Sequence, residues 1–292
     1  MTAVEPRRFT FSNPTGGSLV GYHWQAAAAA PPAVPLIIVH GFGEHARRHS
    51  RLARAAAAAG HDVYGFDQAG HGESPGARAI VDGYGPALAA IAALVQRAAA
   101  PGQGHAARPV LFGHSMGGAI ALEYALGEPD SLAAQILSAP ALQDAVKRPA
   151  WLLSLAGSIA RLLPSVPVAR LDVSLISRDT GEVQRYRDDP LIHHGGVPAV
   201  TGYTVNSRGP ALIASARRLR LPTLVLHGEA DGIMDVEGSR RLAASAPQGT
   251  LTLHTFPGAY HELHHDLAST GVREQVGALV LAFLARHASD AS

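Results

Sequence analysis

The stretch Gly113–His114–Ser115–Met116–Gly117 has the pattern G-x-S-x-G, between the apolar run Val110–Leu111–Phe112 and a helix-like segment. A serine at the tip of such a strand-to-helix turn is held in strained backbone. Glycines two residues to either side remove Cβ atoms that would clash. The following helix directs its first N–H groups toward the point where an oxyanion would form. The pattern predicts a nucleophile at Ser115; the alternative is an ordinary glycine-rich turn.

Short apolar runs alternate with helix-like segments on both sides of this turn. Strands are predicted at residues 35–40, 62–66, 110–112, 135–138, 223–227 and 251–254, and helices at about 51–59, 84–99, 116–126 and 272–285. This alternation is typical of an α/β protein with a mostly parallel central sheet flanked by helices.

The alternation stops between about residues 141 and 210. That segment contains an apolar helix-like stretch, residues 151–163, and a polar stretch, residues 177–190. We interpret it as a mainly helical cap inserted above the sheet. The predicted organisation is therefore a core of residues 1–140 and 211–292, with residues 141–210 as the cap.

A nucleophilic serine needs a histidine base and an acid that orients the base. On this architecture the acid and then the histidine follow the serine along the chain. Asp231 comes just after the strand at 223–227, and His261 comes after the strand at 251–254. Both positions lie beyond the C-terminal ends of parallel strands, where such sheets build their sites. We predict that Asp231 and His261 complete the site, with Glu229 and Asp235 as local competitors for the acid.

A second glycine-rich turn, His40 to His45, follows the first parallel strand. Its Phe42 N–H is predicted to be one oxyanion donor and the Met116 N–H the other. The alternative is a tight loop whose glycines serve only its geometry.

The stretch His261 to His265 also fits H-E-x-x-H, the zinc-protease pattern. That motif needs a continuous helix, whereas Pro257 and Gly258 lie immediately upstream and no third ligand is evident. With His261 assigned to Ser115, we expect no metal site. The chain also lacks a P-loop and a G-x-G-x-x-G after a strand, so we expect no cofactor.

Composition narrows the classes of function further. The 292 residues include 24 Lys and Arg against 23 Asp and Glu, a net charge of +1, which predicts no nucleic-acid partner. There is no cysteine, which excludes disulfides and thiolate chemistry. The N-terminus lacks the apolar run of a signal peptide, and no uninterrupted apolar run is long enough to span a membrane. We therefore expect a cytoplasmic protein.

Together these motifs resemble the monoacylglycerol lipase/lysophospholipase family of the α/β-hydrolase superfamily. The family's H-G-x-G-E-H signature is matched at residues 40–45, its G-H-S-M-G-G elbow at 113–118 and its D-x-x-G-H-G-x-S turn at 67–74. The resemblance spans roughly residues 8–288, and it implies an α/β-hydrolase fold with a helical cap.

In that family a polar cluster beside the catalytic residues holds the glycerol headgroup. By motif offset its members correspond to Glu44, Arg48 and His264, with Arg47 as a substitute for Arg48. The family's cap is apolar, lies over the acyl tunnel and in some members touches the membrane. The matching apolar stripe here is Trp151, Leu152, Leu153, Leu155, Ile159, Leu162 and Leu163, which could equally be the cap's own buried face.

The resemblance implies a serine carboxylester hydrolase that cleaves a lipid-like substrate, monoacylglycerol, to glycerol and a fatty acid. It also implies transient contact of the cap with a membrane surface. The same residues would serve a lysophospholipase or a general carboxylesterase, and a catalytically silent ligand-binding protein is the non-enzyme alternative. The sequence does not predict the oligomeric state.

Overall fold

The computed structural model describes residues 5–27, 33–99, 108–146 and 150–288. Within these ranges eight strands form one sheet in the order β1-β2-β4-β3-β5-β6-β9-β10. The strands are β1 (Arg7–Ser12), β2 (Ser18–Trp24), β3 (Leu36–Val39), β4 (Val63–Phe66), β5 (Val110–His114), β6 (Ala134–Ser138), β9 (Thr223–Gly228) and β10 (Leu251–Phe256). β1 and β2 are antiparallel to their neighbours, whereas the strands from β4 to β10 are parallel. The predicted mostly parallel sheet is confirmed.

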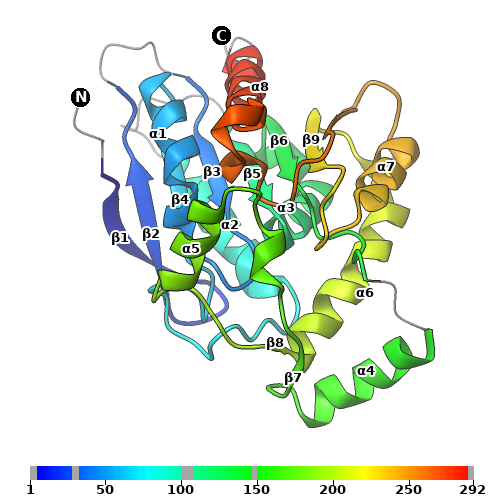
Figure 1. The fold of residues 1–292 in the computed structure, drawn as a ribbon. Helices are drawn as coiled ribbons and strands as arrows, with labels where there is room; N and C mark the ends of the chain where they lie inside the picture. The colour runs from blue at the N-terminus through cyan, green and yellow to red at the C-terminus, as the bar shows by residue number, and fades with distance from the viewer. Residues whose placement is uncertain (1–4, 28–32, 100–107, 147–149, 289–292) are drawn as a thin grey trace.

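Helices cover both faces of this sheet (Figure 1). They are α1 (Ser50–Ala58), α2 (Gly85–Ala98), α3 (Met116–Gly127), α4 (Ala150–Leu162), α5 (Thr180–Asp188), α6 (Ala199–Ser215), α7 (Val236–Ser245) and α8 (Val272–Ala288). Side chains from α1 and α8 pack on one face, and those from α2, α3, α6 and α7 pack on the other.

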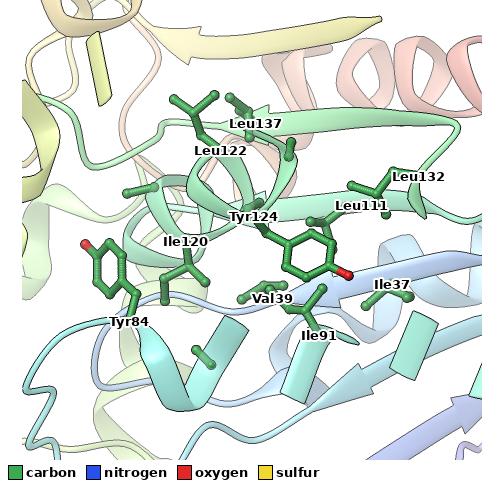
Figure 2. Close-up of a cluster of buried hydrophobic side chains, with 14 of the residues drawn as sticks. Ile37, Val39, Tyr84, Ile91, Leu111, Ile120, Leu122, Tyr124, Leu132 and Leu137 are labelled. Carbon is green, nitrogen blue, oxygen red and sulfur yellow. The ribbon is translucent and has the colours of Figure 1, made fainter. Parts of the chain in front are cut away.

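The strand β3 shows why the sheet is buried on both faces. All four of its residues, Leu36 to Val39, are fully buried. Successive side chains of a strand point to opposite faces of the sheet. Ile37 and Val39 therefore belong to the hydrophobic cluster that packs against α2 and α3. Leu36 and Ile38 belong to the cluster on the other face, which packs against α1 and α8. Figure 2 shows the first cluster, where strand side chains meet those of the covering helices. The continuous apolar run in the sequence is the consequence of this two-sided burial.

The chain leaves the sheet after β6 and returns to it at β9. The intervening segment carries α4, α5, α6 and a small antiparallel pair, β7 (Pro167–Ala169) and β8 (Val197–Pro198). In Figure 1, α4 lies away from the sheet at the lower edge of the view. Leu212 and Ile213, near the end of α6, pack into the core beside α3. The division of the chain at residues 140 and 211 stays a prediction.

Candidate active site

Ser115 lies at the turn between β5 and α3 in a backbone conformation that few residues other than glycine adopt. Its φ is +54° and its ψ is −121°. Such a conformation costs on the order of 1–3 kcal/mol and persists only when its surroundings hold it. Here the Ser115 N–H donates to Ser138 O at 2.9 Å, and Ser115 O accepts from Ala141 N at 2.9 Å. The strand next to β5 and its following loop therefore fix the turn.

The two flanking glycines permit the close approach of this turn to its neighbours. A Cβ added at Gly113 would lie 2.3 Å from Gly117 O, and one added at Gly117 would lie 2.2 Å from Val39 O. Real Cβ atoms do not tolerate such distances, so a side chain at Gly113 would push β5 away from the start of α3, and one at Gly117 would push α3 away from β3. The G-x-S-x-G spacing therefore reflects backbone contact on both sides of Ser115.

Asp231 and His261 come together at the same edge of the sheet. Asp231 follows β9 and His261 follows β10, and His261 Nδ1 lies 2.6 Å from Asp231 Oδ2. The other carboxylate oxygen, Oδ1, accepts from the N–H groups of Ile233 and Met234 at 2.8 and 3.0 Å. Both of its oxygens are thus engaged, and the carboxylate is fixed in the orientation that holds the imidazole.

The competing acids lie elsewhere. Asp235 caps the N-terminus of α7 by accepting from the Glu237 N–H, and Glu229 accepts from the Thr255 hydroxyl. Among the sequence candidates, the structure therefore brings Asp231 to His261.

Asp231 and His261 each stabilise the charged form of the other, although burial disfavours both charges. Burial favours a neutral Asp231, but His261 and His227 outweigh it and hold the pKa of Asp231 well below its usual range. Burial likewise favours a neutral His261, but the charge and hydrogen bond of Asp231 outweigh it and raise the pKa of His261 above its ordinary value. The pair is an ionised carboxylate beside a histidine of increased basicity.

A cavity of about 580 Å³ opens at this edge, and both Ser115 and His261 line it. Its volume is in the usual range for small-molecule sites. Several apolar residues of its wall come from the segment between β6 and β9: Ile159, Leu171, Leu175, Ile176 and Val205. The nucleophile and base candidates therefore share one compartment with a largely apolar wall.

The two predicted oxyanion donors border the same compartment. Phe42 and Met116 both line the cavity, and Met116 is the first residue of α3, where the helix leaves N–H groups without intrahelical acceptors. A Cβ added at Gly41 would lie 3.1 Å from Ser115 Cβ, so the loop bearing Phe42 passes close to the nucleophile. Glu44 fixes this loop by accepting from Gly41 N at 2.5 Å. Both predicted donors therefore lie close to Ser115, and their role in binding an oxyanion stays a prediction.

The three residues assigned to the headgroup by resemblance occupy different positions. Glu44 is buried and lines the cavity, whereas Arg48 and His264 are not among the described residues that do so. Arg48 lies behind Glu44, with its Nε 3.4 Å from Glu44 Oε2. His264 stacks on His49 at a ring distance of 4.7 Å. The structure thus brings Glu44 and Arg48 together and leaves His264 in an adjoining layer of histidines.

Glu262 is a cavity residue to which the sequence analysis gave no role in the Ser115 site. Its carboxylate lies 2.5 Å from Arg48 Nη2 and 2.7 Å from His265 Nδ1. Burial favours its neutral form, but Arg48 and then His265 outweigh it and lower the pKa of Glu262 to about 2. The ion pair joins residues 214 positions apart, so no local pattern could have found it.

The H-E-x-x-H stretch is not a long helix. Leu263–His265 forms a single 3₁₀ turn, and His261 and His265 bind different carboxylates, Asp231 and Glu262. In the part of the chain that the structure describes, no group of three or more His, Asp or Glu side chains is placed to hold a metal ion.

The segment between β6 and β9, which we predicted to be the cap, contacts the loop that carries His261. Glu262 N donates to Ile176 O at 2.7 Å, and the Ser177 hydroxyl donates to His265 O at 2.7 Å. The Arg178 guanidinium binds both oxygens of Asp266, with Nε 2.8 Å from Oδ1. Residues 176–178, which we name the cap strap, therefore fix the histidine loop from the cap side.

Part of the cap's apolar stripe is exposed. Leu162 and Leu163 expose 79% and 56% of their surface, while Ile159 lines the cavity. The side chains of the other stripe residues, at 151–155, lie outside the described part of the chain. None of the helices in the described ranges has both the length and the apolar character needed to cross a membrane.

Comparison with known proteins places this geometry in a family. A sequence profile of the family described as serine aminopeptidase S33 matches residues 30–268. The monoacylglycerol lipase of Mycolicibacterium smegmatis is 32% identical over 270 residues, covering 92% of this chain and 95% of that protein. The monoglyceride lipase of Rattus norvegicus is 33% identical over 257 residues, covering 87% of this chain and 83% of that protein.

Solved structures agree with the sequence comparison. The crystal structure of Paleococcus ferrophilus monoacylglycerol lipase is similar with a TM-score of 0.81 at 32% identity, covering 92% of this chain and 99% of that one. The expected α/β-hydrolase fold is confirmed. The chain therefore belongs to the serine aminopeptidase S33 and monoglyceride lipase family of α/β hydrolases.

Proposed function

We propose that this protein is a serine carboxylester hydrolase that cleaves monoacylglycerol to glycerol and a free fatty acid. The observation that carries the proposal is the His261–Asp231 pair beside Ser115 at one end of a largely apolar cavity. The full-length similarity to lipases that act on monoacylglycerol, as their names state, supports this substrate.

In the acylation step, His261 Nε2 takes the proton of the Ser115 hydroxyl as Oγ attacks the ester carbonyl. Asp231 keeps the other ring nitrogen protonated and stabilises the imidazolium. The N–H groups of Phe42 and Met116 stabilise the oxyanion. The carbon–oxygen bond to glycerol then breaks, and His261 gives its proton to the departing glycerol oxygen.

Deacylation repeats these steps with water. His261 takes a proton from a water molecule, whose oxygen attacks the acyl carbon of the Ser115 ester. The tetrahedral intermediate collapses, the proton returns to Ser115 Oγ, and the fatty acid leaves. No cofactor takes part in either step.

The polar and apolar parts of the cavity fit a single-chain acylglycerol. We infer that the acyl chain lies against the apolar cap residues and that the glycerol lies near Glu44, with Arg48 and His264 supporting that end. The exposed Leu162 and Leu163 would face the lipid surface from which such a substrate is drawn. Because a long-chain monoacylglycerol is poorly soluble in water, we infer that the cap transiently contacts the membrane from which the substrate is taken.

The test compares the hydrolysis of 1-monooleoylglycerol, lysophosphatidylcholine, a short p-nitrophenyl ester and a triacylglycerol. We expect monoacylglycerol to be preferred. Ser115→Ala should lower kcat by about 10⁴-fold or more, because the nucleophile is lost. Ser131→Ala, at the opposite end of the sheet beside the start of β6, is the matched control and should retain activity.

Other outcomes discriminate the alternatives. Preference for lysophosphatidylcholine or activity on the short ester alone would replace the substrate and keep the mechanism. Failure of Ser115 to react with a fluorophosphonate would instead indicate a ligand-binding protein, since only an activated serine is labelled.

A further inference from the structure

Glu262 is the residue immediately after His261 and is one of the residues that line the cavity. Its side chain is 4% exposed, so it is a buried ionised group beside the proposed reacting atoms. Neither the proposed chemistry nor the resemblance to relatives gives it a role. A buried charge in this position acts on any charge that a substrate brings into the same compartment.

Arg48 is enclosed between two carboxylates. Its Nε lies 3.4 Å from Glu44 Oε2 and its Nη2 lies 2.5 Å from Glu262 Oε2. The guanidinium also stacks on the Tyr186 ring, 4.8 Å from its centroid. Glu44 and Glu262 both line the cavity. Two acidic residues therefore line it, whereas Arg48, which contacts both of their carboxylates, is not among its described lining residues.

Burial keeps two neighbouring histidines, His114 and His264, from adding positive charge here, and His265, which contacts Glu262, is not among the described residues that line the cavity. Burial, with the nearby charge of His261, lowers the pKa of His114 to about 3. Burial, with the nearby charge of His265, holds the pKa of His264 well below its ordinary value. His49 Nε2 lies 3.2 Å from Glu44 Oε1, so this ring packs against the Glu44 carboxylate.

The remaining charged groups of the wall belong to the cap. They are Asp144, Arg170 and Asp172. These three add two negative charges and one positive charge, so they also leave the lining acidic.

We propose that Glu262 is a specificity-determining residue, whose carboxylate makes the headgroup end of the cavity net negative and thereby selects acyl esters with an uncharged headgroup over esters with an anionic phosphate headgroup. This proposal rests on the proposed function, because it assumes that the headgroup of the substrate lies near Glu44 and Glu262. A phosphate brought to this end would meet two buried carboxylates in a medium that screens charge weakly. Discrimination here arises by repulsion of the wrong substrate.

The experiment uses three non-hydrolysable octyl ethers that differ in headgroup charge. They are 1-O-octylglycerol, its 3-phosphate and its 3-amino-3-deoxy analogue, each measured as a competitive inhibitor of p-nitrophenyl butyrate hydrolysis at pH 8. At that pH a histidine with an ordinary pKa is neutral. Wild type should bind the neutral ether at least about tenfold more tightly than the phosphate, which corresponds to about 1.4 kcal/mol.

Glu262→Gln keeps the size and the acceptor oxygen of the side chain and removes its charge. Relative to the neutral ether, we expect the phosphate to gain about tenfold in affinity, again about 1.4 kcal/mol, and the ammonium ether to lose affinity. Glu237→Gln is the matched control, because it removes one carboxylate from the exposed start of α7. It should leave all three inhibition constants unchanged.

Each result has one meaning. Glu262→Gln changing all three inhibition constants by the same factor would show a merely structural role and overturn the proposal. Equal affinity of wild type for the neutral ether and the phosphate would overturn it without any variant. Failure of the proposed function is seen separately, as hydrolysis of the chromogenic ester without hydrolysis of monoacylglycerol, and the inhibition constants remain measurable in that case.

Discussion

His261 can act as a base only in its neutral form, so its pKa sets the acid limit of activity. Burial lowers that pKa, but Asp231 outweighs burial and raises it above its ordinary value. We therefore predict that kcat/KM for a soluble p-nitrophenyl ester falls with decreasing pH through an apparent pKa above the ordinary 6.5. The measurement is a pH–rate profile of the free enzyme between pH 5 and 9.

The charge of Glu262 also contributes to raising the pKa of His261. The same profile for Glu262→Gln should therefore show its acid limb at lower pH than wild type. Glu237→Gln, with its exposed carboxylate, is the control and should not move the limb. If the apparent pKa of the wild-type acid limb were 6.5 or lower, it would contradict our inference that the contact with Asp231 raises the pKa of His261.

Gly117 offers a prediction about stability. Because a Cβ at this position would lie 2.2 Å from Val39 O and 2.4 Å from His40 O, Gly117→Ala must displace backbone that the core holds in place. We expect the free energy of unfolding to fall by about 2–3 kcal/mol, as for overpacking of a close-packed site. Urea denaturation monitored by circular dichroism measures it.

Gly127 is the matched control, because it ends the same helix and nothing lies within 4 Å of an added Cβ. Gly127→Ala should be neutral or stabilise by up to about 1 kcal/mol, owing to the higher helix propensity of alanine. Similar losses for both variants would mean that the close approach at Gly117 does not limit stability.

The sequence predicted the individual site residues as far as their signals were local or followed chain order. Ser115 has its own five-residue pattern, and Asp231 and His261 were proposed from their places after predicted strands, where the structure brings the two together. Glu262 was absent from the predicted site because its partner Arg48 is distant in sequence. A contact of that kind arises only when the fold brings two loops together.

At the scale of elements, prediction succeeded where burial imposes a pattern. The run at residues 35–40 became β3 and the segment at 116–126 became α3, each to within two residues at either end. β1 and β2 were both missed: β1 is an edge strand whose residues are mostly exposed, and β2 is largely buried but Gly21 interrupts its apolar run. The polar stretch at 177–190 contains α5, and its signal was Asp179, which caps the helix by accepting from Gly181 N and Glu182 N.

The cap strap gives a prediction at the same scale. Arg178→Met removes the guanidinium that binds both oxygens of Asp266, a carboxylate whose side chain is 2% exposed. We expect unfolding free energy to fall by about 2 kcal/mol, because a buried carboxylate loses its cation. The histidine loop would also lose its anchor, so kcat for the chromogenic ester should fall several-fold.

Arg185→Met is the control for this strap prediction, since it removes an exposed arginine from α5 in the same cap. Its ion pair with Glu182 has a well-exposed guanidinium, which makes the effect on unfolding small. If Arg178→Met destabilised the protein and left kcat unchanged, the strap would serve the fold and not the histidine loop.

For the whole molecule, the apolar end of the cap predicts how substrate is reached. Leu162 and Leu163 are largely exposed, and Val166, Val168 and Tyr203 are also exposed in the same cap segment. Because the net charge is only +1, contact with lipid should depend on apolar burial and be insensitive to salt. We predict that a Leu162→Ser, Leu163→Ser double variant binds phosphatidylcholine vesicles more weakly, with about tenfold lower kcat/KM for vesicle-borne monoacylglycerol, corresponding to about 1.4 kcal/mol.

A water-soluble substrate serves as the control for the effect of the two leucine substitutions. The two leucines have no part in the proposed chemistry, so the double variant should hydrolyse a water-soluble p-nitrophenyl ester at the wild-type rate. Co-sedimentation with vesicles, repeated at low and high salt, measures binding directly. Equal losses on both substrates would mean that the leucines support the packing of the cap, and unchanged activity on vesicles would mean that the protein reaches lipid through another face. Only a loss confined to vesicle-borne substrate assigns this end of the cap to the lipid surface.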